Sequence, residues 1–251
     1  MAAMAETAPL LRPGARCGLD DLTEVSVRHG FVQKVYGIVA AQLLLTVAIG
    51  AVIMKAGEKL RHNEGVTLTL TFMSLTVSLG LMCVFTCKPN LRREFPTNYI
   101  LLALFTVTEA VMVGFVSLQY TEESLFMALG ITAVAVVAMS VFACQTRWDF
   151  RGVGPYVFCA FAILSVSGLL VGMPYLLGLA GPAALHVHRL LMSACGALVL
   201  SVYLIFDTQL IIGGKHGERF EVDDYAMAAI CLYLDIVQIF QCVLEVFGNR
   251  K

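Results

Sequence analysis

Two carboxylic acids stand alone inside long apolar runs near the end of the sequence. Asp207 lies in Leu-Ile-Phe-Asp-Thr, and Asp235 lies in Leu-Tyr-Leu-Asp-Ile. A carboxylate at bilayer depth costs about 2.5 to 3.5 kcal/mol on insertion scales, so an acid that is kept at such a position usually has a function. The default hypothesis is therefore an intramembrane acid pair that handles protons or cations.

The spacing of the two acids allows them to meet. Asp235 follows Asp207 by 28 positions (235 − 207), and the polar stretch from Gly213 to Asp224 lies between them. In a helical hairpin that folds within this stretch, the acids lie about 9 and 16 Å from the turn, at about 1.5 Å per residue. The two depths agree within about one to two helical turns, so the carboxyls meet if the helix faces match.

Two carboxyls at hydrogen-bonding distance in a low dielectric cannot both ionise cheaply, so we expect the pair to share a proton. Loss or gain of that proton near neutral pH changes the local charge by one unit and alters the helix contact, which is a physical route to a pH-gated pore. When deprotonated, the same oxygens are hard ligands suited to transient Ca²⁺ binding. The structural alternative is that each Asp only hydrogen-bonds a neighbouring helix.

Glu109 is a third isolated acid, in Phe-Thr-Val-Thr-Glu-Ala-Val-Met-Val-Gly, with Thr106 and Thr108 beside it. It either supplies another oxygen to an ion pathway or accepts hydrogen bonds from an adjacent helix. The sequence leaves both interpretations open.

The elements that carry these acids are predicted to be membrane spans. Of the 251 residues, 59% are hydrophobic and 14% are charged, whereas a soluble domain has about 25% charged residues. Seven runs are long enough to cross about 30 Å of hydrocarbon. They lie near Val35 to Met54, Val66 to Cys87, Thr97 to Tyr120, Ser124 to Thr146, Val153 to Met173, Leu190 to Ile212 and Tyr225 to Phe247.

The predicted fold is all-α: a polytopic membrane protein with a bundle of seven transmembrane helices. Residues 30–251 form this domain, and residues 1–29, rich in Ala, Gly and Pro, are predicted to be a disordered cytosolic tail. The last segment, with its acids and the terminal Arg250-Lys251, suits either a full span or a re-entrant hairpin.

The basic residues indicate the orientation. With a cytosolic N-terminus, 11 of the 17 basic residues lie on the cytosolic side, which the positive-inside rule favours. These are Arg12, Arg16, Arg28, Lys34, Lys88, Arg92, Arg93, Arg147, Arg151, Lys215 and Arg219. The first connection, with Lys55, Lys59 and Arg61, weakens this preference.

Several ordered motifs resemble the Bax inhibitor/lifeguard family, the transmembrane BAX-inhibitor-motif proteins. The run from Ala228 to Phe240 (Ala-Ala-Ile-Cys-Leu-Tyr-Leu-Asp-Ile-Val-Gln-Ile-Phe) is similar to the C-terminal signature of that family. The other matching motifs are Lys34-Val35-Tyr36 with Gln42 to Thr46, Phe105 to Ala110, Gln145 to Phe150 and Phe206 to Gln209. The short N-terminus without proline repeats resembles most closely the Golgi anti-apoptotic protein (lifeguard 4) branch.

The resemblance implies a pH-regulated Ca²⁺ leak channel of Golgi or endoplasmic reticulum membranes that lowers stored Ca²⁺ and suppresses cell death. Asp207 and Asp235 match the di-aspartyl sensor positions of the family, and Glu109 matches an acid of its third span. The implied partners are the lipid bilayer, Ca²⁺, H⁺ and membrane proteins that regulate apoptosis. No cofactor is implied beyond Ca²⁺ as the permeant ion.

The sequence also bears on other classes of protein. An intramembrane serine protease needs a histidine within the membrane, and all five histidines lie in connections or at span ends, so no enzyme is predicted. The net charge of −1 predicts no nucleic-acid partner. A proton-coupled transporter and a non-conducting, protein-binding regulator of cell death remain as alternatives.

Overall fold

The computed structural model describes residues 13–251 apart from 61–63, 89–90, 92, 147, 149, 177–180 and 214–221. Within the described residues, the chain forms seven α-helices and two short 3₁₀ turns. The helices are α1 (Pro13–Leu60), α2 (Glu64–Cys87), α4 (Thr97–Ser117), α5 (Glu122–Gln145), α6 (Gly154–Leu176), α7 (Pro182–Ile212) and α8 (Tyr225–Phe247). The turns η1 (Arg151–Val153) and η2 (Val222–Asp224) precede α6 and α8. The predicted all-α class is confirmed.

Each of the seven predicted runs corresponds to one of these helices. Six of the described helices contain a stretch long and apolar enough to cross a membrane, and α6 contains a shorter apolar stretch, Gly154–Gly168. The last run is one unbroken helix of 23 residues, about 35 Å long. It has the length of a full span, and it contains no break at which a re-entrant hairpin would turn.

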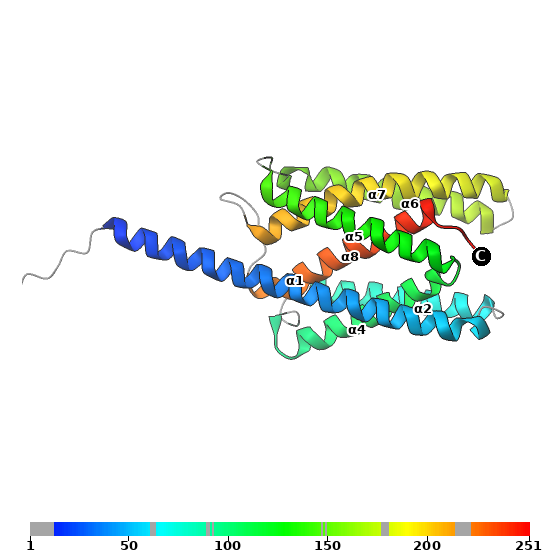
Figure 1. Ribbon diagram of the computed structural model, residues 1–251, viewed down its shortest axis with the longest axis horizontal. Helices are drawn as coiled ribbons and strands as arrows, with labels where there is room; N and C mark the ends of the chain where they lie inside the picture. The colour runs from blue at the N-terminus through cyan, green and yellow to red at the C-terminus, as the bar shows by residue number, and fades with distance from the viewer. Residues whose placement is uncertain are drawn as a thin grey trace, which may run out of the picture.

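The first helix begins earlier than its predicted span. α1 starts at Pro13, before the predicted end of the tail at residue 29, and residues 1–12 lie outside the described residues. Proline suits the first position of a helix because its fixed φ and missing N–H cost nothing there. The 48 residues of α1 exceed the thickness of a bilayer, and its first part projects beyond the bundle (Figure 1).

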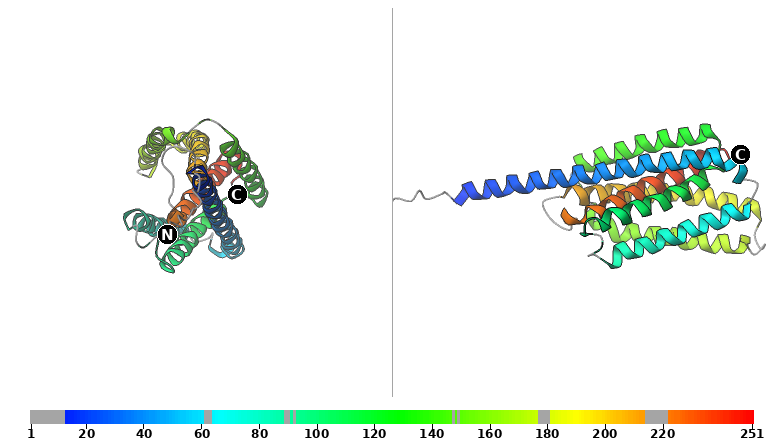
Figure 2. Two further views of the ribbon diagram at one scale, coloured as in Figure 1. Left: turned by 90° about the vertical axis from the view of Figure 1, so that its left-hand side faces the viewer. Right: turned by 90° about the horizontal axis from the view of Figure 1, so that it is seen from below.

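The helices form two groups with α8 between them. α1 and α2 pack on α4 in one group, and α5 and α6 pack on α7 in the other. α8 packs against α7, α1, α5 and α4, and it runs through the middle of the bundle in the view along the helix axes (Figure 2). Accordingly, 56% of the apolar stretch of α8 and 50% of that of α4 are buried, against 17% for α1, α2, α5 and α7. α8 is therefore the central helix.

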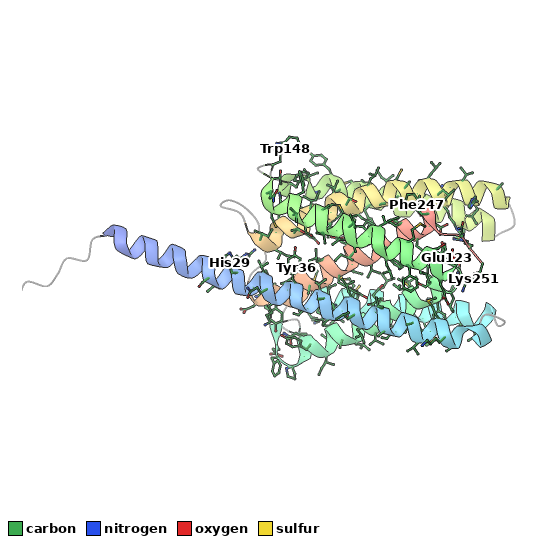
Figure 3. The ribbon with its side chains drawn as sticks, in the orientation of Figure 1. His29, Tyr36, Glu123, Trp148, Phe247 and Lys251 are labelled. Atoms are coloured by element: carbon green, nitrogen blue, oxygen red, sulfur yellow. The ribbon has the colours of Figure 1, made fainter. Side chains whose placement is uncertain are left out.

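The two ends of the bundle differ in what they contain. We call one end, where α7 stops and α8 starts, the hairpin end. α7 stops at Gly213, whose φ of +72° is favourable only for glycine and whose N–H donates to the carbonyl of Gln209. We call the other end, where the chain finishes, the C-terminal end; Figure 3 labels Glu123, Phe247 and Lys251 there.

The chain finishes by pairing with the turn between α4 and α5. The Thr121 N–H donates to the carbonyl of Asn249 at 3.1 Å, and the Tyr120 hydroxyl donates to Glu245 Oε2 at 2.6 Å. Arg250 forms an ion pair with the same Glu245 oxygen at 2.6 Å. Burial raises the pKa of Tyr120, and the hydrogen bond to Glu245 raises it further, so Tyr120 remains a neutral donor. These contacts fasten α8 to the end of α4 and the start of α5.

Three aromatic rings join α2, α4 and α8 in the core. Phe105 lies edge-on to both Phe85 and Tyr233, with ring centroids 6.5 Å apart in each pair. All three side chains are buried, and Phe105 is 1% exposed. Edge-to-face pairs of this kind contribute about 0.5–1.5 kcal/mol each beyond the area they bury.

Phe105→Ala is expected to lower the free energy of unfolding by about 3–5 kcal/mol, because it removes the ring that joins the other two. The melting temperature of the detergent-solubilised protein, measured by size-exclusion chromatography after heating, checks this. Phe126→Ala is the matched control, because Phe126 is 74% exposed on the outer surface. Equal melting temperatures for the two variants would contradict the assigned core.

Candidate functional site

Asp207 and Asp235 lie on α7 and α8, two helices that pack closely against each other. Asp207 lies five residues before the end of α7 at Ile212 (212 − 207), and Asp235 lies ten residues after the start of α8 at Tyr225 (235 − 225). These offsets place the two acids about 8 and 15 Å from the hairpin end. Both side chains are buried, with 5% and 7% of their surface exposed.

The two carboxyls are brought together by this packing. The charge of Asp207 acts on Asp235, and Tyr203, one helical turn before Asp207, lies near both carboxyls. Oδ2 of Asp235 is buried and has no hydrogen-bond partner among the described residues. A buried carboxyl oxygen without a partner carries the full cost of its desolvation, so this oxygen favours a proton or a cation as its partner.

The last turn of α7, beyond Asp207, is held from two sides. Arg28 of α1 donates from Nε to the carbonyl of Ile212 at 3.2 Å and from its terminal nitrogen to the carbonyl of Leu210 at 2.6 Å. A guanidinium at this position satisfies the free carbonyls of a helix C-terminus and complements its partial negative charge. Arg28 therefore fixes the end of the helix that carries Asp207.

Gln209 links the same turn to the connection between α5 and α6. Its Oε1 accepts from the Phe150 N–H, and its Nε2 donates to the Trp148 carbonyl, each at 2.9 Å. Figure 3 labels Trp148 at the hairpin end, where this connection lies. Phe206 approaches Gly154 so closely that a Cβ there would meet its ring at 2.9 Å. One contact thus joins two motifs that are far apart in the sequence, Gln145 to Phe150 and Phe206 to Gln209.

The start of α8 is held by charged and aromatic contacts. Arg93 donates to both carboxylate oxygens of Asp224 at 2.9 Å, and Asp224 immediately precedes α8. The ammonium of Lys34 lies 3.2 Å from the centre of the Tyr225 ring, a cation–π contact, and Asn98 hydrogen-bonds the Tyr225 hydroxyl. The helix that carries Asp235 is thereby joined to α1 and α4 at the hairpin end.

Glu109 lies in a different part of the bundle from the acid pair. It is 6% exposed, its carboxyl lies beside Ser78 of α2, and its charge acts on Tyr233 of α8. Tyr233 precedes Asp235 by two residues, so the two side chains leave α8 about 200° apart. The structure places Glu109 on the opposite side of α8 from Asp207 and does not bring the three acids together.

Neutral polar side chains lie in the same region of the bundle as Glu109. Gln42 of α1 donates to the Thr106 hydroxyl of α4 at 2.9 Å, and the hydroxyls of Thr46 and Tyr233 are 2.8 Å apart. Hydrogen bonds of this kind join α1, α4 and α8 in the apolar interior. They give Glu109 a polar environment that a lone acid in a helix would lack.

The described residues contain no cluster of three or more His, Cys, Asp and Glu side chains that would hold a metal ion. Ca²⁺ takes six to eight oxygen ligands, and the acid pair supplies only its two carboxyl groups.

Some residues that build the site carry little signal in the sequence. In the sequence, Arg28 and Arg93 are recognisable only as positive charges near the ends of spans. Tyr233 is one aromatic residue in an apolar run. Asp224, an acid directly before a predicted helix, indicates a helix N-terminus, whereas its pairing with a cation carries no signal in the sequence. Which cation meets it depends on how α4 packs on α8, and this is a tertiary property.

The fold and the site define a class of protein: a polytopic helical membrane protein with a buried pair of acids between its central helix and a neighbouring helix. Residues 28–251 match the family model described as inhibitor of apoptosis-promoting Bax1. The chain belongs to the Bax inhibitor/lifeguard family, and it is an integral membrane protein.

Relatives from animals and plants agree with this assignment. Protein lifeguard 3 of Mus musculus is 33% identical over 228 residues, which cover 89% of this chain and 70% of the relative. Protein lifeguard 3 of Homo sapiens is 34% identical over 230 residues, which cover 90% and 70%. The BI1-like protein of Arabidopsis thaliana is 33% identical over 243 residues, which cover 94% and 85%. The assignment to the lifeguard 4 branch stays a prediction.

Arg93→Gln is expected to raise the rate of backbone hydrogen exchange in the first two turns of α8, because the contact that anchors Asp224 is lost. Hydrogen-exchange mass spectrometry of the solubilised protein measures this. Lys55→Gln, a change of the same type at an exposed position of α1, should leave these turns unchanged. If the Arg93 variant exchanges like the wild type, the ion pair does not anchor α8.

Proposed function

We propose that this protein is a pH-sensitive Ca²⁺ leak channel of Golgi or endoplasmic reticulum membranes that lowers stored Ca²⁺ and so inhibits apoptosis. One observation carries the proposal. Two buried carboxyls from neighbouring helices lie within range of each other's charge, and one of their oxygens has no hydrogen-bond partner among the described residues. A pair that only joined helices would use its oxygens to accept hydrogen bonds from the adjoining helix.

The gate in this proposal is the contact between α7 and α8. When the pair holds a shared proton, its net charge is reduced and the two helices pack closely. Loss of that proton leaves two negative charges in a low dielectric, where their repulsion is strong. The helices then separate, or water or a cation enters between them. Because Arg28 and Arg93 fix the two helices at the hairpin end, and the Tyr120–Glu245 hydrogen bond fixes α8 at the C-terminal end, movement is concentrated in the middle of the α7–α8 contact.

The permeant ion in this proposal is Ca²⁺, and the acid pair is a transient site for it. Two carboxylates are hard ligands that attract Ca²⁺ but do not complete its coordination shell, so the ion binds briefly and leaves. Glu109 is proposed as a second acidic position on the opposite side of α8. The hydroxyls of Ser78, Thr46 and Tyr233 lie between α2, α1 and α8 near it and supply neutral oxygens.

The orientation in this proposal places the hairpin end at the cytosol, together with the N-terminus. The described cations at this end, Arg28, Lys34 and Arg93, agree with the positive-inside rule. The acid pair then lies within the cytosolic half of the bilayer and responds to cytosolic pH. The role in apoptosis is supported by the name of the family, and membrane proteins that regulate apoptosis are the partners we propose.

Asp207→Asn and Asp235→Asn are each expected to abolish or flatten the pH dependence of a Ca²⁺ leak, because a single remaining acid cannot share a proton with a second one. The measurement uses purified protein in liposomes that contain a Ca²⁺ dye, with influx followed from about pH 6 to 8, where such a pair is expected to titrate.

Asp223→Asn is the matched control, because Asp223 is exposed in η2, outside the spans, and undergoes the same chemical change. Its pH profile should equal that of the wild type. Absence of Ca²⁺ influx in the wild type would support a non-conducting regulator, and a saturable flux of an organic solute would support a proton-coupled transporter. Unchanged pH profiles in both acid variants would refute the sensor.

Glu109→Gln is expected to lower the Ca²⁺ influx about tenfold, equivalent to about 1.4 kcal/mol, and to leave the shape of the pH profile intact. The reason is that Glu109 lies apart from the acid pair and provides charge for the ion without taking part in the shared proton. Glu123→Gln, at an exposed position of α5, serves as the control in the same liposome assay. An unchanged influx for the Glu109 variant would assign this acid a structural role.

A further inference from the structure

A groove of about 540 Å³ runs between α1 and α5 on the outer surface of the bundle, with α4 and α8 at its base. α1 and α5 each pack on α8, but within the described residues they make no extensive contact with each other. The groove therefore opens sideways, toward the hydrocarbon of the bilayer. Its size falls within the range of about 300–1,000 Å³ that is typical of ligand pockets.

The walls of the groove are apolar over most of its length. Leu43, Val47 and Met54 line it on α1, Leu125 and Val136 line it on α5, and Phe240 forms part of its base. An empty space of this size is unfavourable in a packed protein, and water gains few hydrogen bonds on such walls. The groove fits a hydrocarbon chain.

The C-terminal end of the groove is charged. Lys55 of α1 and Glu122, the first residue of α5, both line it there and are exposed. From Glu122 to Val137 the groove follows α5 for 15 residues (137 − 122), or about 22 Å. It thus runs from the membrane surface past the middle of a bilayer about 30 Å thick. An ammonium and a carboxylate at the surface end complement the phosphate and the amine of a zwitterionic lipid headgroup.

One wall of the groove carries a polar group without a partner, and the opposite wall carries a glycine with open space beside it. Thr132 lines the wall, is 4% exposed, and its hydroxyl has no hydrogen-bond partner among the described residues. Gly50 lines the opposite wall, and a Cβ built there meets no atom within 4 Å.

We propose that this groove binds one phospholipid with a zwitterionic headgroup. An acyl chain lies between α1 and α5, the phosphate faces Lys55, and the headgroup amine faces Glu122. The lipid contacts α8 at Ile236 and Val237, directly after Asp235. The site is a property of the fold and does not depend on whether the protein conducts Ca²⁺.

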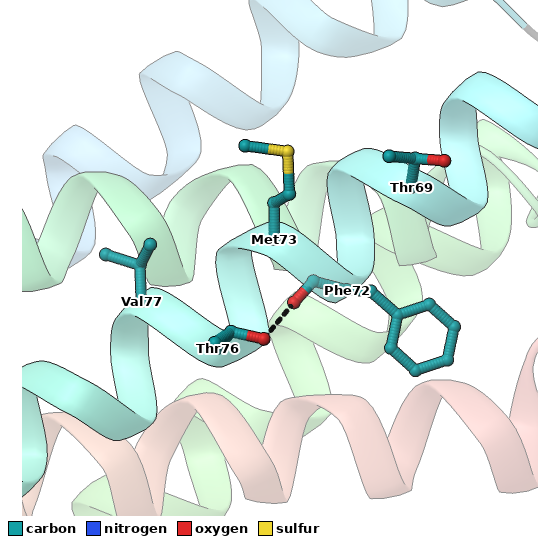
Figure 4. A pocket seen from close by; sticks show the side chains of 5 residues that line it. All are labelled: Thr69, Phe72, Met73, Thr76 and Val77. Carbon is teal, nitrogen blue, oxygen red and sulfur yellow. Dashed lines mark hydrogen bonds between the residues drawn. The ribbon is translucent and has the colours of Figure 1, made fainter.

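A shallow pocket on the outer surface of α2, called here the α2 dent, provides an internal comparison. Thr69, Phe72, Met73, Thr76 and Val77 line it, all on one helix, and the Thr76 hydroxyl donates to the Phe72 carbonyl (Figure 4). Phe72 and Met73 are 59% and 60% exposed. This face has no second wall, so it contacts only the lipids that surround any membrane protein.

The test is photolabelling of the full-length protein, reconstituted in vesicles of phosphatidylcholine that carry a diazirine on one acyl chain. Mass spectrometry of the peptides locates the label. We expect residues 43–55 of α1 and 122–137 of α5 to be labelled about tenfold more than the α2 dent. A tenfold ratio corresponds to a difference of about 1.4 kcal/mol in binding free energy. Equal labelling of the groove and the dent would overturn the proposal.

Gly50→Phe fills the groove and should lower its labelling about tenfold. Gly37→Phe is the matched control, because Gly37 lies on the same helix, outside the groove, and also has open space beside it. Ala51→Leu, at a second lining position, tests the same point if Gly50→Phe does not give a monodisperse protein. Unchanged groove labelling in a well-folded Gly50 or Ala51 variant would refute the site.

A competition assay tests the headgroup. Unlabelled phosphatidylcholine should reduce the labelling of the groove more strongly than the anionic phosphatidylglycerol does, and Glu122→Gln should remove this difference. Equal competition by the two lipids in the wild type would overturn the assignment of a zwitterionic headgroup.

Discussion

The central helix α8 carries a carboxyl that the fold keeps away from water, and the rest of the bundle is arranged around that constraint. Asp235 faces α7, where the charge of Asp207 acts on it, while Tyr233 faces α1 and α4 on the other side of the same helix. A helix with polar groups on two opposite faces cannot lie at the edge of a bundle in lipid without exposing one of them. This accounts for the burial of α8 between the two groups of helices.

Burial of two acids opposes folding, so other contacts must offset it. The edge-to-face rings of Phe85, Phe105 and Tyr233 provide packing near the centre. At the hairpin end, Arg28 and Arg93 hold the termini of α7 and α8, and at the C-terminal end the hydrogen bond from Tyr120 to Glu245 holds the end of α8. The strongest polar contacts thus lie at the two ends. Among the described residues, few polar contacts join α7 and α8 in the middle, where the acids lie.

The apolar runs made most of the fold predictable. Hydropathy alone predicts all seven helices, and six of the described helices contain a stretch long enough to span the bilayer, because every backbone group in a bilayer must be satisfied within a helix. The similar depths of Asp207 and Asp235 also follow, since a hairpin joins two antiparallel spans, but whether the two carboxyls face each other depends on the rotation of each helix. The start of α1 at Pro13 does not follow from the sequence. A segment rich in Ala and Gly has the composition of a flexible chain, yet this composition does not prevent a helix.

The sequence does not predict on which side of α8 Glu109 lies. It also does not predict the contacts that hold the ends of the two helices carrying the acid pair. Depth in the bilayer is set by the position in a span, but the direction of a side chain is set by the rotation of each helix about its axis. Glu109 and the acid pair lie on opposite sides of α8 because of that rotation. Likewise, Arg28 meets the end of α7 only because α1 crosses the hairpin end, and Gln209 meets Trp148 across 61 residues of sequence. The groove between α1 and α5 is visible only once four helices are assembled.

The shared proton between Asp207 and Asp235 is the central claim, and infrared difference spectroscopy tests it most directly. The spectrum of the reconstituted protein, recorded as the pH is varied, shows a carbonyl band for a protonated carboxyl that is absent from a carboxylate. We predict such a band near neutral pH in the wild type, altered or lost in both Asp207→Asn and Asp235→Asn and unchanged in Asp223→Asn. A wild-type spectrum without a protonated carboxyl at neutral pH, or a band unaffected by either acid substitution, would contradict the account.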